Sequence, residues 1–161
     1  MKRIHYVTIS LAIILLDAVT KWLVSANIAL HDAVTIVPDL FSLVHVRNTG
    51  AAFGIGANAD SRVVPLLLNS GAILVFLIVV AYALRTPLHD RALQIGLHLI
   101  LGGAIGNLVD RFRFGYVVDF LDFYVRDHHW PAFNVADSAI CVGIALLFLD
   151  MRRKPQTAAA A

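Results

Sequence analysis

Apolar residues gather in four long stretches of the 161-residue chain, and most polar residues lie between them. The stretches cover about 4–24, 63–84, 92–109 and 133–151. Since a helix needs about 20 apolar residues to cross a bilayer, the pattern predicts an all-α polytopic membrane protein with four transmembrane helices. The third stretch is rich in small residues, which let neighbouring membrane helices approach closely.

The first stretch has a second interpretation, a cleaved signal peptide. Lys2 and Arg3 precede it, and Val24-Ser25-Ala26 loosely fits a cleavage site. However, Asp17 and Lys21 would interrupt the region just before that site, and the apolar run is long for a signal sequence. We therefore expect a retained helix.

Two longer segments, about 25–62 and 111–132, connect these helices. Residues 41–47 alternate as in a β-strand, and Asn48-Thr49-Gly50 then predicts a turn. The second segment is rich in aromatic residues, which favour the membrane interface. We expect a small β-sheet element from the first and a short loop or helix from the second, within one domain of residues 1–154 that a disordered tail, 155–161, follows.

Lysine and arginine near the helix ends indicate the orientation. Four spans put both termini on one side of the membrane, and that side carries seven Lys and Arg residues against five on the other. The cluster Arg152-Arg153-Lys154 directly follows the last span. The sequence therefore predicts cytoplasmic termini, with the segments 25–62 and 111–132 on the outer side of the membrane.

Composition narrows the range of functions. The chain is 59% hydrophobic with a mean hydropathy of +0.77, and its net charge of +2 is scattered, so no basic stripe supports binding to nucleic acid. The single cysteine, Cys141, excludes an intramolecular disulfide and a cysteine-based metal site. The seven histidines show no metal-ligand spacing. We expect no metal and no other cofactor.

Asp119 and Asp137 each lie where an apolar stretch meets the predicted membrane boundary, and a carboxylate there is costly unless it is paired, protonated or facing water. Asp137 lies only about 6 Å below the start of the last span, so both are at similar depth on one side. Two carboxyls that meet cannot easily both ionise, so one can activate a water while the other protonates a carbonyl oxygen. The alternative is that each caps a helix or pairs with an arginine such as Arg111 or Arg126.

Other polar residues lie within the predicted spans. Asp17 and Lys21 are four residues apart and can neutralise each other, either as a structural ion pair or in support of a site. Asn107 and Arg111 are also four apart, and Arg111 could hold a phosphate or a carboxylate or extend to the lipid headgroups. A dyad of Lys21 and Ser25 is disfavoured because both lie at a crowded helix end.

Five motifs follow one another between residues 17 and 138. They are Asp17-Ala18-Val19-Thr20-Lys21, Asn48-Thr49-Gly50-Ala51-Ala52-Phe53-Gly54, Gly102-Gly103-Ala104-Ile105-Gly106-Asn107-Leu108-Val109-Asp110-Arg111, Gly115-Tyr116-Val117-Val118-Asp119-Phe120 and Phe133-Asn134-Val135-Ala136-Asp137-Ser138. In this order the set closely resembles bacterial lipoprotein signal peptidase, also called signal peptidase II. One departure is Ala18, where relatives often have Gln.

The resemblance implies an aspartyl endopeptidase of the inner membrane whose catalytic dyad is Asp119 and Asp137, with Asp17 and Lys21 in support. The residues that it implies around the substrate are Asn48, Gly103, Asn107, Arg111 and Asn134. The implied substrate is a prolipoprotein with a diacylglyceryl-modified cysteine, cleaved on the amino side of that cysteine. We expect the loop 49–56 to cover the substrate. Membrane lipids are expected partners, and a monomer is expected to suffice because the site forms within one chain.

Two other classes of protein also place aspartates in a membrane. A proton-coupled transporter would need acidic groups distributed along a path, whereas Asp119 and Asp137 are expected on one face. A non-catalytic membrane subunit would leave Asn107, Asn134 and the carboxylate pair unexplained. Both are therefore less consistent with the sequence than an enzyme.

Overall fold

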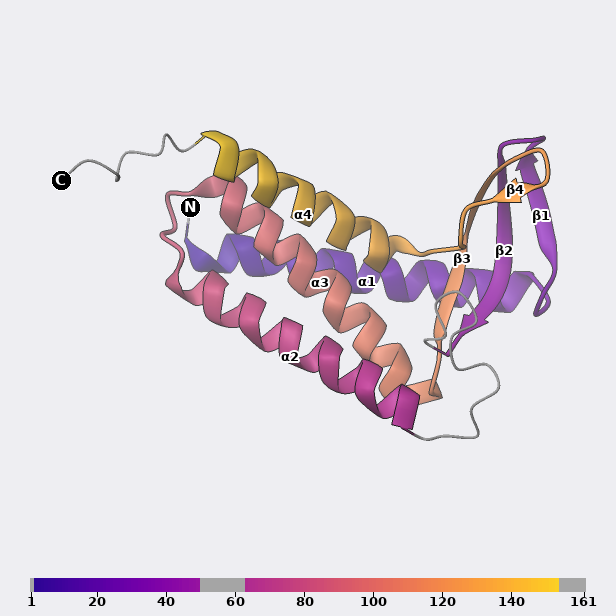
Figure 1. Ribbon diagram of the computed structural model, residues 1–161, viewed down its shortest axis with the longest axis horizontal. Helices are drawn as coiled ribbons and strands as arrows, with labels where there is room; N and C mark the ends of the chain where they lie inside the picture. The colour runs from indigo at the N-terminus through magenta and orange to yellow at the C-terminus, as the bar shows by residue number, and fades with distance from the viewer. Residues whose placement is uncertain (1, 50–62, 154–161) are drawn as a thin grey trace.

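The computed structural model describes residues 2–49 and 63–153. Four helices share one long axis: α1 (Arg3–Asn27), α2 (Val63–Arg85), α3 (Arg91–Phe114) and α4 (Val135–Arg153). The start of α1 and the end of α4 lie at the same end of the molecule (Figure 1). Each apolar stretch of the sequence therefore forms one helix, with its ends shifted by a few residues.

Helix α3 is the centre of the bundle. It packs against α1, α2 and α4, and α1 also packs against α4. Among the described residues, α2 packs along α3, and its end also meets α1 where Arg3 donates a hydrogen bond to the carbonyl oxygen of Leu84. The contact with α2 rests on a buried apolar cluster of Ala83, Leu93, Leu97 and Leu101. Helices α1, α3 and α4 thus form a core, with α2 attached along α3.

Two glycines, Gly103 of α3 and Gly143 of α4, allow these two helices to pack closely. A Cβ added to Gly103 would collide with the carbonyl oxygen of Ala136 and lie 2.8 Å from Cγ1 of Ile140. A Cβ on Gly143 would lie 2.6 Å from the carbonyl oxygen of Gly96. Because real Cβ atoms do not come this close to backbone oxygens, the tight α3–α4 contact depends on these positions having no side chain.

A four-stranded antiparallel sheet lies at the other end of the helices (Figure 1). Its strands are β1 (Ala33–Val37), β2 (Phe41–Asn48), β3 (Val117–Val125) and β4 (His128–His129), in that spatial order. The predicted strand at 41–47 is confirmed as β2. A buried cluster of Val24, Ile28 and Phe120 fixes the end of α1 to the sheet.

The expectation for the segment 111–132 is wrong in its secondary structure. Helix α3 continues past Val109 to Phe114 and ends at Gly115, whose φ of 79° is the left-handed conformation that favours glycine. The chain then forms β3 and β4 instead of a loop or short helix. The first four residues of β3 are all buried, so the strand has no alternating pattern by which the sequence could reveal it.

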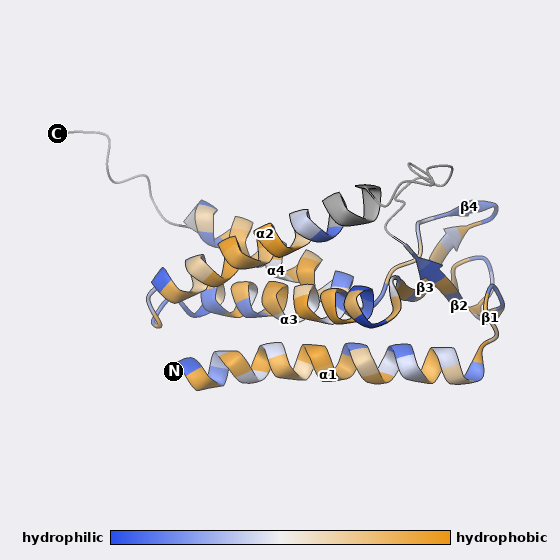
Figure 2. Cartoon of the chain, turned by 90° about the horizontal axis from the view of Figure 1, so that it is seen from below, coloured by the Kyte–Doolittle hydropathy of each residue, from blue (hydrophilic) through white to orange (hydrophobic). Residues whose placement is uncertain are grey.

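The distribution of polarity is inverted relative to a water-soluble bundle. Apolar side chains such as Leu15 (66% exposed) and Phe148 (62% exposed) cover the outside, while Asp17 and Asn134 are almost fully buried. Apolar colour also covers much of the helix surface in Figure 2. Among the described residues, α1 and α3 are long and apolar enough to cross a membrane. These features are those of a membrane protein.

Two expectations fall on residues that the structure does not describe. The predicted loop over the substrate, 49–56, lies outside the described residues except for Thr49. The predicted tail, 155–161, lies wholly outside them.

The glycine contacts give a first prediction, on stability. Gly103→Ala inserts a methyl group against the backbone of α4 and should lower the free energy of unfolding by about 1–3 kcal/mol. Gly71→Ala in α2 is the matched control, because its Cβ meets nothing within 4 Å. That control should be neutral or stabilise by up to about 1 kcal/mol through helix propensity. Thermal unfolding in detergent micelles measures both, and equal effects would contradict the packing role of Gly103.

Candidate active site

Asp119 lies on β3, opposite Val46 of β2, and is only 3% exposed. Each of its carboxyl oxygens accepts one amide hydrogen bond. Asn134 donates to Oδ1 over 2.7 Å, and Asn48 at the end of β2 donates to Oδ2 over 3.0 Å. Burial is the main cause that raises the pKa of Asp119, and the nearby Asp137 carboxyl adds to it. The two amide donors and Lys21 lower the pKa, and the net result is a pKa of about 6.

Asp137 lies in the first turn of α4, where Asn134 caps the helix. The side-chain Oδ1 of Asn134 accepts the backbone N–H of Asp137 over 3.0 Å. In return, Oδ2 of Asp137 accepts the backbone N–H of Asn134 over 3.3 Å. This reciprocal pair is a capping box, and the partial positive charge of the helix N-terminus favours a carboxylate there. Asp137 therefore takes part in the cap of α4, as the alternative interpretation of the sequence expected, and the cap orients its side chain.

The two aspartates share their partners. The Nδ2 of Asn134, which bonds Asp119, also donates to Oδ1 of Asn107 over 3.2 Å. Asn107 in turn donates from its own Nδ2 to Oδ1 of Asp137 over 2.7 Å. The predicted convergence of Asp119 and Asp137 is therefore confirmed: β3 and α4 bring both carboxyls into one hydrogen-bonded network. Neither forms an ion pair with an arginine of the described chain.

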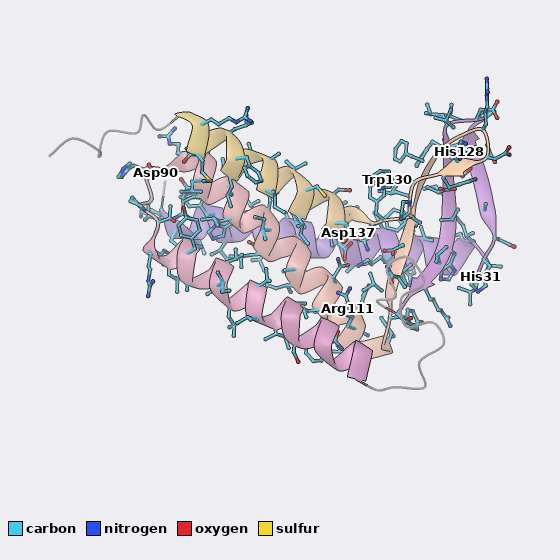
Figure 3. All side chains as sticks on the ribbon, in the orientation of Figure 1. His31, Asp90, Arg111, His128, Trp130 and Asp137 are labelled. Carbon is cyan, nitrogen blue, oxygen red and sulfur yellow. The ribbon has the colours of Figure 1, made fainter. Side chains whose placement is uncertain are left out.

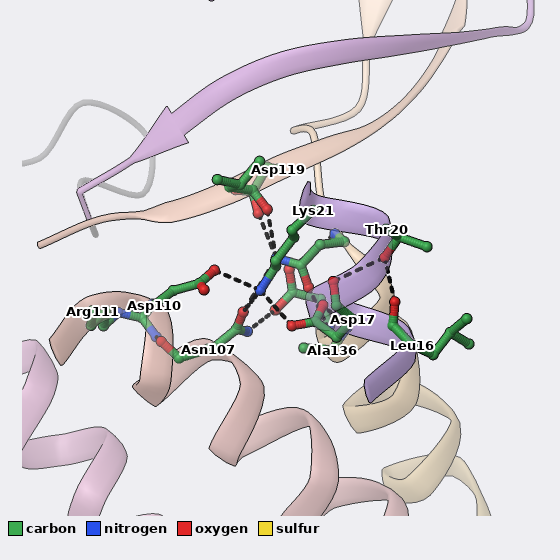
Figure 4. A network of polar contacts seen from close by, with 12 residues as sticks. Leu16, Asp17, Thr20, Lys21, Asn107, Asp110, Arg111, Asp119 and Ala136 are labelled. Atoms are coloured by element: carbon green, nitrogen blue, oxygen red, sulfur yellow. Dashed lines mark hydrogen bonds and ion pairs between the residues drawn. The ribbon is translucent and has the colours of Figure 1, made fainter. Parts of the chain in front are cut away.

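Lys21 borders this network and contacts three oxygens, as Figure 4 shows. Its Nζ is 2.7 Å from Oδ2 of Asp17, 2.8 Å from Oδ2 of Asp110 and 3.0 Å from Oδ1 of Asn107. The predicted ion pair of Asp17 and Lys21 is present, and both residues are buried. Because the ammonium only donates, it holds the oxygen of the Asn107 amide towards itself and leaves the NH2 group facing Asp137.

Asp17 joins α1 to the other core helices. Its Oδ1 accepts the backbone N–H of Ala136, one of the N–H groups that α4 leaves unpaired at its start. On the other side, a Cβ on Gly106 would lie 2.6 Å from Oδ2 of Asp17. The absence of a side chain at Gly106 therefore lets the buried carboxylate reach both α4 and Lys21.

Asp110 belongs to the third of the five motifs, and its sequence position alone predicts no role for it. The available signal was spacing, since residues 107 and 110 lie on the same face of a helix. Only the fold reveals that this face meets Lys21. The second acid leaves the cluster of Asp17, Lys21 and Asp110 with one more negative than positive group.

The remaining expected site residues differ in their settings. Arg111 donates from Nη1 to the carbonyl oxygen of Asn107 over 3.4 Å and has no ion-pair partner among the described residues. Its position near the end of α3 is labelled in Figure 3, below Asp137. Gly103 lies in the α3–α4 contact, so packing accounts for its identity. Within residues 2–49 and 63–153, no group of three or more His, Cys, Asp or Glu is arranged to hold a metal ion.

Comparison with known proteins gives a consistent picture. The family model described as signal peptidase (SPase) II matches residues 9–153. The lipoprotein signal peptidase of Syntrophotalea carbinolica is 49% identical over 146 residues, which cover 90% of this chain and 89% of that protein. The lipoprotein signal peptidase of Geobacter metallireducens is 48% identical over 141 residues, with 87% and 85% covered.

Two solved structures also match. A bacterial membrane enzyme determined by the in meso method at 1.9 Å resolution has a TM-score of 0.80 and 25% identity, covering 93% of this chain and 94% of that one. A second, at 2.3 Å resolution, has a TM-score of 0.74 and 24% identity, covering 98% and 93%, and shares the fold. On the family match and the identities above, the chain belongs to the signal peptidase II family, the lipoprotein signal peptidases that process prolipoproteins.

Proposed function

We propose that this chain is an aspartyl endopeptidase that removes the signal peptide from diacylglyceryl-modified prolipoproteins, cleaving on the amino side of the lipidated cysteine. Asp119 and Asp137 are the proposed catalytic dyad. The observation that supports this proposal most strongly is that Asn134 contacts both residues, bonding the carboxyl of Asp119 and the backbone of Asp137. Asp119 is buried and Asp137 is partly buried, and the electrostatic interaction between their carboxyls supports a pair that shares one proton.

The proposed reaction is general acid–base hydrolysis. The ionised carboxyl removes a proton from a water as its oxygen attacks the peptide carbonyl, and the protonated carboxyl donates to the carbonyl oxygen. The tetrahedral intermediate then collapses as the cysteine nitrogen takes a proton from the dyad and leaves as a free amine. The other product is a signal peptide with a new carboxylate. Asp119, whose pKa is raised, is the proposed holder of the proton at rest.

The amides around the dyad have two proposed tasks. Asn48, Asn107 and Asn134 hold the carboxyls in place, and together with Arg111 and Gly103 they border the proposed substrate site. Arg111 lacks an ion-pair partner in the described chain, which leaves its charge available to a carboxylate or phosphate. Asp17 and Lys21 are the proposed support from α1.

The proposed membrane arrangement follows the sequence. All four helices cross the inner membrane, both termini are cytoplasmic, and the sheet with the dyad lies at the periplasmic face. Substrate lipid chains and signal helix reside in the same bilayer, so the enzyme meets its substrate by diffusion in the membrane plane. Residues 1–154 are the proposed single domain, and the contacts that hold the dyad among the described residues lie within one chain, so a monomer is the proposed working unit.

The first test of this proposal is substitution of the dyad. Asp119→Asn and Asp137→Asn preserve shape but abolish acid–base chemistry, so each should lower kcat by at least about a hundredfold. Asp122→Asn is the matched control, a buried aspartate on the same strand that pairs with His129 outside the network. Cleavage of a lipidated peptide in detergent measures all three. Near-normal rates in both dyad variants would contradict the enzyme proposal.

The second test concerns pH. As pH rises through the pKa of Asp119, about 6 in the free enzyme, the shared proton is lost and kcat/KM should fall. The Asn48 amide favours the ionised carboxyl, so Asn48→Ala should raise the pKa of Asp119 and move this alkaline limb to higher pH. Asn27→Ala, at an exposed asparagine at the end of α1, is the control. A limb that stays in place or moves to lower pH in Asn48→Ala would argue against Asp119 as the acid.

The third test separates positioning from stability at Lys21. Lys21→Met leaves the buried carboxylate of Asp17 and the partly buried one of Asp110 without their cation, and should cost about 3–5 kcal/mol. Adding Asp17→Asn restores the original net charge of the cluster and should recover much of the thermal stability. The Asn107 amide remains unfixed in this double variant, so kcat should stay low with little change in KM. A stable double variant with normal kcat would show that Lys21 has only a structural role.

A further inference from the structure

A hollow lies between α1 and α3, beside the cluster of Asp17, Lys21 and Asp110. It has a volume of about 250 Å³, and neither Asp119 nor Asp137 borders it. Its apolar walls include Ile14, Ala18 and Trp22 of α1 and Val109 and Phe114 of α3. We call it the α1–α3 groove. The proposed cleavage chemistry makes no use of it.

The groove has the length of one membrane leaflet. Along α1 it extends from Ile14 to Ser25, a rise of eleven residues or about 16 Å of helix. This is about half of the roughly 30 Å hydrocarbon core of a bilayer. Val118 of β3 borders the end nearest the sheet. A lipid chain that enters from the leaflet on the sheet side would therefore run along the groove without crossing the membrane midplane.

A cation lies at the sheet end of the groove. Arg113 is exposed, its guanidinium lies 5.1 Å from the centre of the Phe114 ring, and it has no ion-pair partner among the described residues. Lys21 also borders the groove, but its three oxygen contacts occupy its three donors. Arg113 is thus the positive group that remains for a ligand, and guanidinium pairs well with phosphate.

We propose that the α1–α3 groove is a binding site for a membrane phospholipid of the sheet-side leaflet. One acyl chain lies along Ala18 and Val109, and the phosphate contacts Arg113. The bound lipid covers the wall of the groove that Asp17, Lys21 and Asp110 form and keeps water from this charged cluster. The inference uses the proposed membrane arrangement but does not depend on the cleavage chemistry. It also differs from a substrate site, because a diacylglyceryl group carries no phosphate.

Trp22 offers a direct readout. The chain has two tryptophans, so Trp130→Phe leaves Trp22, which lines the groove, as the only one. In detergent micelles, this full-length variant is titrated with phosphatidylglycerol or with diacylglycerol, each carrying the same brominated acyl chains that quench tryptophan. Half-maximal quenching should need at least about tenfold less phosphatidylglycerol than diacylglycerol, the size expected for one charge-assisted phosphate contact.

Substitutions of Arg113 test whether its guanidinium contacts the phosphate of the lipid. Arg113→Gln should abolish the preference for phosphatidylglycerol, and Arg113→Lys should retain part of it. Arg126→Gln, at an exposed arginine in the turn between β3 and β4 that does not border the groove, should leave the preference unchanged. Equal quenching by the two lipids, or a preference that survives Arg113→Gln, would overturn the proposal. Cleavage rates play no part in this readout, so its failure is distinguishable from failure of the proposed function.

Discussion

The side-chain amide of Asn134 is the contact on which the arrangement of the site depends. Its oxygen accepts the backbone N–H of Asp137, and its NH2 group donates to Asp119 and to Asn107. An amide has one acceptor end and one donor end, so only one orientation satisfies all of these partners. Since Asn134 is fully buried, water cannot replace a lost partner. The start of α4 and the strand β3 are thereby fixed relative to each other.

The ion cluster around Lys21 extends the same constraint to α1 and α3. Removing charges from water is costly, and within lipid this cost is met only by close pairing and complete hydrogen bonding. Lys21 meets this condition with Asp17, Asp110 and Asn107, and Asp17 also takes a backbone N–H of α4. The polar interior thus connects all three core helices to the aspartates, while the apolar exterior faces lipid. Glycines 103 and 106 allow the backbones to come close enough for these contacts.

Hydropathy predicted the four helices because a lipid-facing helix reveals itself through a long apolar run. The four-residue spacing of Asp17 and Lys21 predicted their ion pair, because residues i and i+4 lie on the same face of a helix. The three-residue spacing of Asn134 and Asp137 is that of a capping box. Only the structure shows that Asn134 of this box also donates a hydrogen bond to Asp119. Strand β3 was missed because buried residues on both faces hide a period of two. The roles of Asp110 and Gly103 depend on which helix faces them, and no local pattern encodes that choice.

The central claim is that Asp119 and Asp137 share one proton in the resting protein. Infrared spectroscopy of the detergent-solubilised chain, followed through a pH titration, detects protonated carboxyl groups directly. The account predicts a protonated carboxyl band that disappears with a midpoint near pH 6 and is absent in Asp119→Asn. A titration identical in the wild type and in Asp119→Asn would contradict it, because Asp119 would then carry no proton in this range.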